Sequence, residues 1–222
     1  MRAEWYPADR MCEPGKESFS YGVIVLAAGS SRRMGRPKLL LPWGDTTVLG
    51  HLIGTWRSLL GGQIAVVCAR DAHAIEEELD RLHFPVENRI FNPDPDRGMF
   101  SSIQRAAAWG GWKGELTHWM IALGDQPHLR AATLQALLDF GAANRDRICQ
   151  PSRQGRPRHP VLLPKPVFDA LRDHPAADLR QFLESHADRL AVFESDDAGL
   201  DFDMDTPSDY ERALRFCFNR GG

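Results

Sequence analysis

The stretch that decides the fold is VLAAGSSRRMGRPKLLLPWG, from Val25 to Gly44. It starts with apolar and very small residues, passes through Gly29, and becomes a basic cluster that ends at Pro37-Lys38. A buried strand that opens into a cationic, glycine-containing loop indicates an anion site, and phosphate is a common occupant of such loops. The spacing matches neither GxxxxGK[ST] nor GxGxxG, which argues against a Walker loop and against a nicotinamide or flavin site.

The bulk composition narrows the class of protein. A length of 222 residues suffices for one domain with a substantial core. A net charge of −3 and a pI near 6.2 argue against a nucleic-acid partner, and no apolar run is long enough to predict a membrane span. The four cysteines have no CxxC spacing, which favours free thiols in a reducing cytoplasm. Residues 1–20 lack the apolar segment of a secretory signal, so we expect a mobile extension there and a single domain over residues 21–218.

Short apolar runs alternate with amphipathic segments along the chain. The apolar runs predict strands buried on both faces, at Gly22–Ala28, Gln63–Ala69 and Thr117–Asp125. The amphipathic segments predict helices at 46–60, 71–82 and 98–110, around Leu134–Leu138, and from Asp205 or Thr206 onward. This order predicts a three-layer α/β/α sandwich with a Rossmann-like, mostly parallel sheet. The less regular stretch from His159 to Ser195 predicts a mixed sheet or an insert.

Ligands of such sheets bind beyond the carboxyl ends of the parallel strands. The loop after the first strand and the loop Gly124-Asp125-Gln126-Pro127 therefore face each other across a crevice. In the first loop, Gly29 lets backbone N–H groups approach an anion, and we assign Arg33 and Lys38 to phosphate oxygens. The alternative is a solvated basic loop.

Acidic residues follow in two places. Asp125 ends an apolar strand, where a carboxylate needs a partner such as hydrated Mg²⁺; capping of the next helix is the alternative. In DFDMDTP, Asp201, Asp203 and Asp205 share one side of an extended segment, and a cation among them would relieve their repulsion. The alternative is one capping residue and two solvated acids.

The loop GRPRHPV adds Arg156, Arg158 and His159, a second anion-binding element for another substrate. Histidine in such a loop more often forms structural hydrogen bonds, and no serine or cysteine nucleophile stands out beside it. Basic residues on a triphosphate and carboxylates on Mg²⁺ suffice for phosphoryl-type transfer, which needs positioning and charge neutralisation rather than a covalent nucleophile.

These residues carry a family resemblance. LAAGSSRRMGRPK resembles the pattern LAAGxSxRMGxPK of nucleotidyltransferases with a MobA-like domain, and NPDPDRGMFSSI, ALGDQP, GRPRHPVLLP and DFDMDTPSDY follow in the family's order. Together they span most of residues 22–214. The resemblance implies a nucleotide-diphospho-sugar transferase (GT-A-like) fold. It is greatest to the molybdenum cofactor cytidylyltransferases, which join CMP from CTP to the phosphate of molybdopterin and release pyrophosphate. The guanylyltransferase branch usually has LAGG where this chain has LAAG.

The resemblance also implies roles for individual residues. The nucleotide-binding residues would be Leu26, Ala27, Ala28 and Gly29 around base and ribose, Arg33 and Lys38 on the triphosphate, and Ser102 on the base. The catalytic set would be Lys38, Arg33 and Asp125. Asp125 would bind Mg²⁺ together with Asp203 or Asp205. The acceptor loop departs from the family's GRRGHPV, because Pro157 and Arg158 precede His159 here.

Two other functions remain open from the sequence. One is an enzyme of the same fold that uses another nucleotide, or a sugar phosphate or other phosphorylated acceptor. The other is a non-catalytic carrier of the molybdenum cofactor. Lys38, Asp125 and Asp203 favour an enzyme, because carriage needs no metal–triphosphate site. For the product we expect transient contact with a molybdenum hydroxylase or its maturation chaperone.

Overall fold

The computed structural model describes residues 18–29, 31–59 and 62–218. The predicted extension lies outside these ranges as far as residue 17. At the C-terminal end of the predicted extension, the Phe19 ring packs against the His118 ring with 4.6 Å between the ring centroids. The Ser20 N–H donates to Thr117 Oγ1 at 3.1 Å.

A mixed, mostly parallel sheet forms the centre of the molecule, with strand order β10-β7-β9-β6-β1-β4-β5 and β8 paired to β7. The strands are β1 (Tyr21–Leu26), β4 (Gln63–Ala69), β5 (Arg89–Asn92), β6 (His118–Leu123), β7 (Ile148–Arg153), β8 (Arg156–Pro157), β9 (Val161–Pro164) and β10 (Leu190–Glu194). Strand β1 is parallel to both β4 and β6, whereas β9 is antiparallel to β6 and β7. A separate antiparallel pair joins β2 (Pro42–Trp43) to β3 (Thr46–Thr47).

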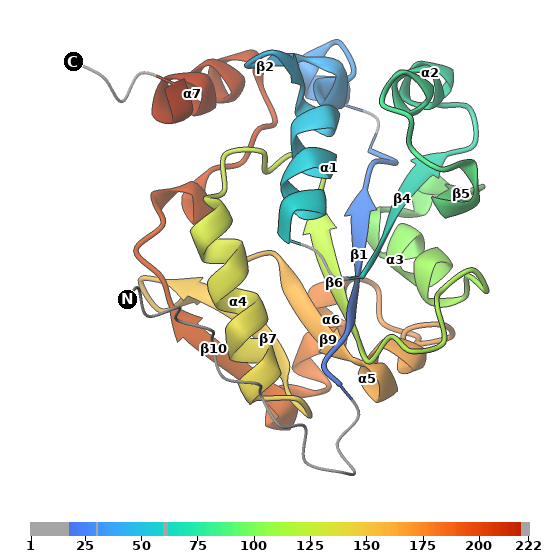
Figure 1. Cartoon of the computed structure of the whole chain (residues 1–222), viewed down its shortest axis with the longest axis vertical. Coiled ribbons are helices and arrows are strands. Elements are labelled where there is room, and N and C mark those ends of the chain that lie inside the picture. The colour runs from blue at the N-terminus through green and yellow to red at the C-terminus, as the bar shows by residue number, and fades with distance from the viewer. Residues whose placement is uncertain (1–17, 30, 60–61, 219–222) are drawn as a thin grey trace, which may run out of the picture.

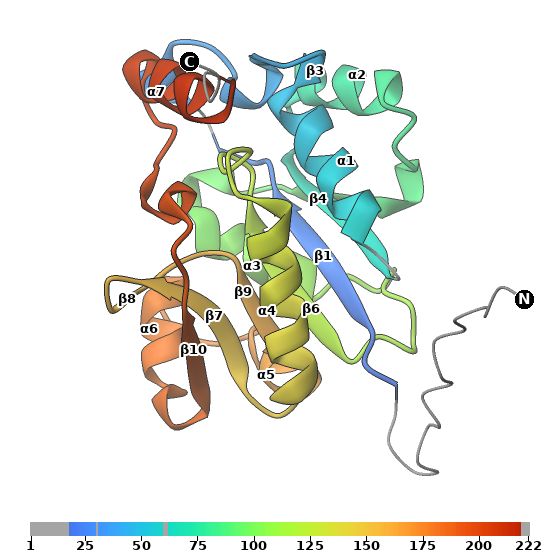
Figure 2. The ribbon, with the colours of Figure 1, turned by 60° about the vertical axis from the view of Figure 1, so that its left-hand side comes forward.

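Helices cover both faces of the sheet, as Figures 1 and 2 show. One face packs against α1 (Val48–Leu59), α2 (His73–Arg81), α4 (Ala131–Ala143) and α7 (Pro207–Phe218). The other packs against α3 (Met99–Ala107), α5 (Lys165–Ala170) and α6 (Leu179–Glu184). Figures 1 and 2 both show α7, the β2–β3 pair and α2 at the end of the molecule toward which β1 points.

The central strand explains why the sheet is covered twice. Side chains alternate between the two faces of a strand, so Val23 and Val25 enter one core and Ile24 enters the other, all three fully buried. The expected three-layer α/β/α fold is confirmed, and the irregular C-terminal stretch supplies the antiparallel β9, helix α6 and edge strand β10.

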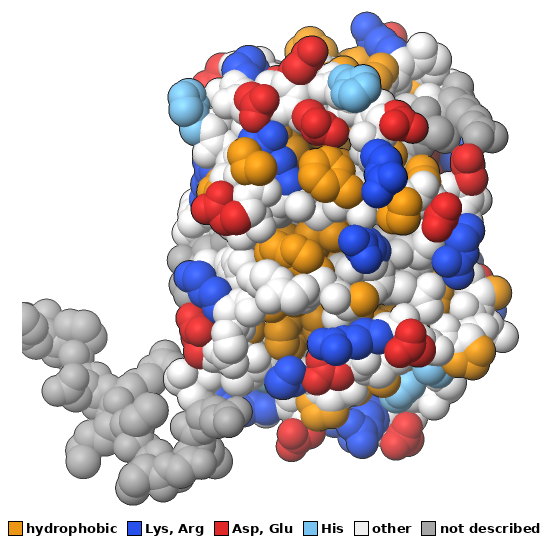
Figure 3. All heavy atoms as spheres, turned by 90° about the vertical axis from the view of Figure 1, so that its right-hand side faces the viewer, with side chains coloured by type: hydrophobic (Ala, Val, Ile, Leu, Met, Phe, Trp, Pro, Cys, Tyr) orange, Lys and Arg blue, Asp and Glu red, His pale blue; other side chains and the backbone are white. Residues whose placement is uncertain are grey.

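The surface over α2, α3 and β5 mixes all side-chain types. Figure 3 shows hydrophobic spots there among interspersed Lys/Arg and Asp/Glu side chains. The exposed large hydrophobic residues of these elements are Phe91 and Met99, at 37% and 42% exposure. None of the described helices has both the length and the apolar content that crossing a membrane requires.

Candidate functional site

A cleft of about 1080 Å³ opens at the carboxyl ends of β1, β4 and β6. Its walls come from the loop after β1, the starts of α2 and α3, and the loop after β6. The sequence-predicted residues that line it are Leu26, Ala27, Ala28, Gly29, Lys38, Ser102 and Asp125. The cleft therefore lies where the strand-end rule places a ligand site.

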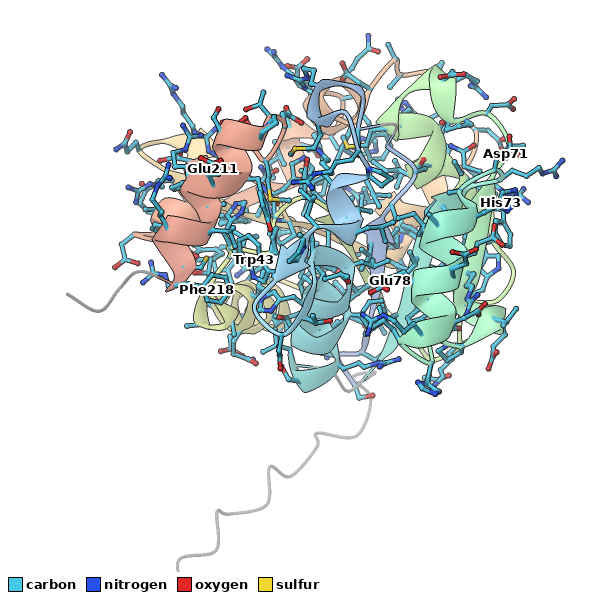
Figure 4. All side chains as sticks on the ribbon, turned by 90° about the horizontal axis from the view of Figure 1, so that it is seen from above. Trp43, Asp71, His73, Glu78, Glu211 and Phe218 are labelled. Atoms are coloured by element: carbon cyan, nitrogen blue, oxygen red, sulfur yellow. The ribbon has the colours of Figure 1, made fainter. Side chains whose placement is uncertain are left out.

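Other lining residues escaped sequence reasoning. Asp71 and His73 stand at the turn from β4 into α2, and Asp96 and Met99 come from the segment before and into α3. Figure 4, which looks onto this end of the molecule, shows Asp71 and His73 on the α2 side and Phe218 on the opposite side, on α7. The signal that could have found Asp71 and His73 was their position just after the second predicted strand.

Gly124 allows β6 to deliver Asp125 into the cleft. A Cβ atom at Gly124 would collide with the carbonyl oxygen of Leu26 in β1. The glycine in LGDQP thus permits close approach of two strand ends, and the loop after β6 begins beside the loop after β1.

The loop after β1 is tightly folded. Ser31 and Gly35 have left-handed φ angles of 50° and 69°, and Met34 and Leu39 are buried and anchor the loop in the core. The Lys38 N–H donates to Ser31 Oγ at 3.1 Å. The anchoring fixes where the Lys38 side chain leaves the backbone; Ser30 lies outside the described residues.

Four charged side chains meet at one end of the cleft. The Lys38 ammonium donates to Asp125 Oδ2 at 2.5 Å and to Asp205 Oδ1 at 3.1 Å. Arg33 Nη2 donates to the other oxygen of Asp205, at 2.6 Å. The structure therefore brings together four of the predicted residues, from three separate segments of the chain.

The environment of Lys38 keeps its ammonium charged. Burial alone would lower its pKa, but the charges and hydrogen bonds of Asp125 and Asp205 outweigh burial and raise the pKa above 10.5. A fixed positive charge of this kind suits neutralisation of phosphate oxygens.

Asp125 and Asp205 also have the chemistry to hold a divalent cation. Both already contact a single cationic group, the Lys38 ammonium, so their carboxylates converge on one point. Mg²⁺ is commonly held by one or two carboxylates, with water and substrate phosphates completing its coordination. Two convergent carboxylates therefore fit a metal that is shared with a substrate. Among the described residues, no cluster of three or more His, Cys, Asp or Glu side chains forms a protein-only metal cage.

The three alternating acids do not share one side, so that expectation is wrong. Asp201 ends the short 3₁₀ helix Ala198–Asp201, which turns the chain, and it accepts from Arg153 Nε at 2.6 Å and Arg158 Nη2 at 2.8 Å. Asp203 is exposed, whereas Asp205 reaches Lys38. Of the two acids left open for the metal, Asp205 shares the Lys38 ammonium with Asp125, and among the described residues no such contact of Asp203 is seen.

The predicted acceptor residues lie at different depths. Arg156 is exposed in β8, and Arg158 is held by Asp201. His159 is largely enclosed just before β9. Burial lowers its pKa to about 4 despite the opposing charge of Asp125, so His159 is neutral near pH 7.

Asp197, which sequence reasoning missed, joins the two acidic segments. Its carboxylate is fully buried and accepts from the Thr133 hydroxyl at 2.7 Å and from the backbone N–H groups of Arg130 and Gly199, each at 3.0 Å. It ties the start of α4, a few residues after Asp125, to the segment that leads to Asp205.

Comparisons with known proteins identify a family and several relatives of this chain. Residues 23–190 match the family described as MobA-like NTP transferase domain. The molybdenum cofactor cytidylyltransferase of Escherichia coli (strain K12) is 29% identical over 188 residues, covering 84% of this chain and 92% of the relative. The molybdenum cofactor guanylyltransferase of Mesorhizobium japonicum is 32% identical over 204 residues, covering 86% and 93%.

Solved structures are also similar to this chain over most of its length. Rv0371c from Mycobacterium tuberculosis H37Rv superposes with a TM-score of 0.71 at 28% identity, covering 89% of this chain and 98% of that one. A manganese complex of the same protein gives a TM-score of 0.66 at 27% identity, covering 89% and 99%. The family match spans most of the sheet and all the residues that line the cleft, whereas Asp205 lies beyond it. The chain therefore belongs to the family of MobA-like NTP transferase domains and is a nucleotidyltransferase of the nucleotide-diphospho-sugar transferase fold.

Proposed function

We propose that the protein transfers CMP from CTP to the phosphate of a molybdopterin-type acceptor, with Mg²⁺ as cofactor and pyrophosphate as the second product. The observation that carries this proposal is the convergence of Lys38, Arg33, Asp125 and Asp205 beside a cleft whose volume of about 1080 Å³ is large enough for a nucleotide. Relatives acting on the molybdenum cofactor support the choice of acceptor.

The reaction exchanges one phosphorus–oxygen bond for another. An oxygen of the acceptor phosphate attacks the α-phosphorus of CTP, and the bond from that phosphorus to the β-phosphate oxygen breaks, so pyrophosphate leaves with the electron pair. Charge builds on the leaving group, and preorganised cations there stabilise the transition state. Lys38 and Arg33 supply that charge when they exchange carboxylate partners for phosphate oxygens.

Asp125 and Asp205 would hold the Mg²⁺ ion. When bound, the ion supplies positive charge to the phosphate oxygens around the reacting centre. The manganese complex of the mycobacterial relative supports a divalent cation in this fold. Asp203 remains a weaker alternative ligand because it is exposed, whereas Asp205 contacts the Lys38 ammonium that Asp125 also contacts.

The end of β1 supports CTP as the nucleotide. Ala28 carries a methyl group where the resembling guanylyltransferases have glycine, and this reduces the room for a purine against the backbone of Ala27–Gly29. Ser102 lines the same cleft from α3. Both a cytidylyltransferase and a guanylyltransferase are similar to this chain, so a preference for CTP would depend on these residues.

For the acceptor, we propose Arg156, Arg158 and His159. Arg158 is held in place by Asp201, and exposed Arg156 is free to reach a phosphate or pterin substituent. His159, neutral near pH 7, can hydrogen-bond the acceptor without adding charge. The reaction would take place in the cytoplasm, and its product would pass to a molybdenum hydroxylase or its maturation chaperone.

Pyrophosphate release tests the proposal. The purified protein is incubated with Mg²⁺ and CTP or GTP, with and without molybdopterin. We expect release that requires molybdopterin and is much faster with CTP. Release that is as fast or faster with GTP than with CTP would contradict the nucleotide assignment. Release in a further assay that supplies a sugar phosphate in place of molybdopterin would contradict the acceptor.

A further inference from the structure

The side chain of Asn92 lies beneath the cleft wall at the end of β5. It is 2% exposed, and its Oδ1 accepts from the backbone N–H of Asp94 at 3.0 Å. A backbone N–H must face the amide oxygen rather than the amide nitrogen, so this bond determines the orientation of the amide. Nδ2 therefore points in the opposite direction, toward α3.

Two serines at the start of α3 receive the amide hydrogens. Asn92 Nδ2 donates to Ser101 Oγ at 2.8 Å and to Ser102 Oγ at 2.9 Å. The Ser101 hydroxyl donates in turn to the carbonyl of Gly98 at 2.8 Å. No such acceptor is present for Ser102 within the described part of the chain, and Ser102 is the serine of the two that lines the cleft.

We propose that Asn92 is a positioning residue that makes Ser102 a hydrogen-bond donor to an acceptor atom of the nucleobase. Amide hydrogens occupy one lone pair of Ser102 Oγ, and an amide nitrogen cannot accept the hydroxyl hydrogen. Ser102 is 3% exposed, so a hydroxyl hydrogen without an acceptor carries a desolvation penalty. A nucleobase N–H opposite Ser102 would leave that penalty in place, whereas a carbonyl or ring nitrogen removes it.

This inference rests on the proposed function and specifies its base recognition. Cytosine presents O2 and N3 as adjacent acceptors, and its amino group at position 4 is the donor on that edge. The base would therefore face Ser102 with O2 or N3 and turn its amino group away. Asn92 would orient the base through Ser102 without touching it.

Asn92→Asp tests the relay because it reverses one hydrogen bond and keeps the side-chain size. A carboxylate still accepts from the Asp94 N–H but donates nothing, so the Ser102 hydroxyl would donate to it and be withdrawn from the base. Binding is measured by titration calorimetry with CTP and with inorganic tripolyphosphate, which has no base. We expect CTP to bind about tenfold more weakly, the scale of one lost hydrogen bond, and tripolyphosphate to bind as before.

Two further variants separate positioning from folding. Ser102→Ala should weaken CTP binding to a similar extent, and adding Asn92→Asp to it should weaken binding no further, because Asn92 acts through Ser102. Ser101→Ala is the matched control: it also removes an Asn92 contact but lies off the cleft, so the preference for CTP over tripolyphosphate should persist.

The outcomes distinguish the relay from the proposed function. If the unaltered protein binds tripolyphosphate as tightly as CTP, base recognition in this cleft fails and the relay fails with it. If the unaltered protein prefers CTP but Asn92→Asp leaves that preference intact, the relay alone is wrong. Additive losses in the double variant, or equal losses for CTP and tripolyphosphate, would also overturn it.

Discussion

Lys38 and Asp125 lie 87 positions apart in sequence, yet the Lys38 ammonium donates to Asp125 Oδ2 at 2.5 Å. The same ammonium reaches Asp205, 167 positions away, at 3.1 Å. One side chain thus holds together the loop after β1, the loop after β6 and the segment before α7. A metal that takes both carboxylates must displace the ammonium, and triphosphate oxygens are the groups that can then receive it.

Asp125→Asn should abolish turnover and leave the fold intact, because an amide cannot offset the charge of a divalent cation on the triphosphate. The measurement is pyrophosphate release at saturating Mg²⁺, with circular dichroism as the check on folding. Near-normal release by a folded variant would remove Asp125 from the metal site.

The two remaining acids should behave differently. Asp205→Asn should reduce turnover strongly, because Asp205 shares the Lys38 ammonium with Asp125. Asp203→Asn is the matched comparison two residues away, and its exposed carboxylate should matter less. Activity is measured as a function of Mg²⁺ concentration for both variants. A larger loss of activity in Asp203→Asn than in Asp205→Asn would identify Asp203 as the second metal ligand.

Lys38→Ala should lower kcat by roughly a hundredfold or more, the scale for losing one preorganised electrostatic contact to a developing charge. The reason is that negative charge accumulates on pyrophosphate as its bond to the α-phosphorus breaks. Steady-state kinetics with CTP separate kcat from KM. A higher KM with unchanged kcat would make Lys38 a docking residue only.

Ala28→Gly should give some GTP-dependent activity, because it removes the methyl group that narrows the end of β1. Parallel assays with CTP and GTP measure the ratio of kcat/KM values for the two nucleotides. An unchanged ratio would mean that Ala28 only packs beneath the loop and that the base is selected elsewhere.

Asp197→Asn should lower the free energy of unfolding by about 1–3 kcal/mol at neutral pH, since a buried acceptor of several hydrogen bonds is altered. Burial by itself would raise the pKa of Asp197, but the hydrogen bonds from Thr133, Arg130 and Gly199 outweigh it and hold the pKa below its ordinary value of 3.8. A depressed folded-state pKa contributes stability above pH 3.8, and that contribution is lost as the pH falls through the folded value. Thermal unfolding measured from neutral pH down to about pH 2 should therefore show that the variant loses less stability on acidification than the unaltered protein. If stability falls equally with pH in both proteins, this role of Asp197 is contradicted.

Local pattern predicted some elements well and others poorly. Strand β4 occupies Gln63–Ala69 as expected, because its apolar run is long and buried on both faces. Strands β5 and β7 went unpredicted for different reasons. The first has four residues and lies at the sheet edge with Phe91 partly exposed; the second buries polar Gln150 and Ser152 around a proline.

For the site too, local sequence pattern does not predict contacts between residues that are far apart in the chain. The strand-end rule placed Lys38 and Asp125 at one end of the sheet, since that rule depends only on strand order. The ion pairs of Asp201 with Arg153 and Arg158 depend on a 3₁₀ turn and on partners more than forty positions away. Alternation along DFDMDTP carries no information about either, which is why it grouped Asp201 with Asp205.

The reversed direction of β9 changes which loop residues can reach a substrate. In β1, β4 and β6 the chain arrives at the cleft as it leaves a strand, so residues after the strand face it. Val161 of β9 pairs with Ile121 of β6 in the opposite direction, so the chain passes the cleft end of the sheet before it enters β9. An insertion or deletion just upstream of His159 would therefore reshape the substrate side of this molecule, whereas one of equal length after Pro164 would fall at the far end of the sheet.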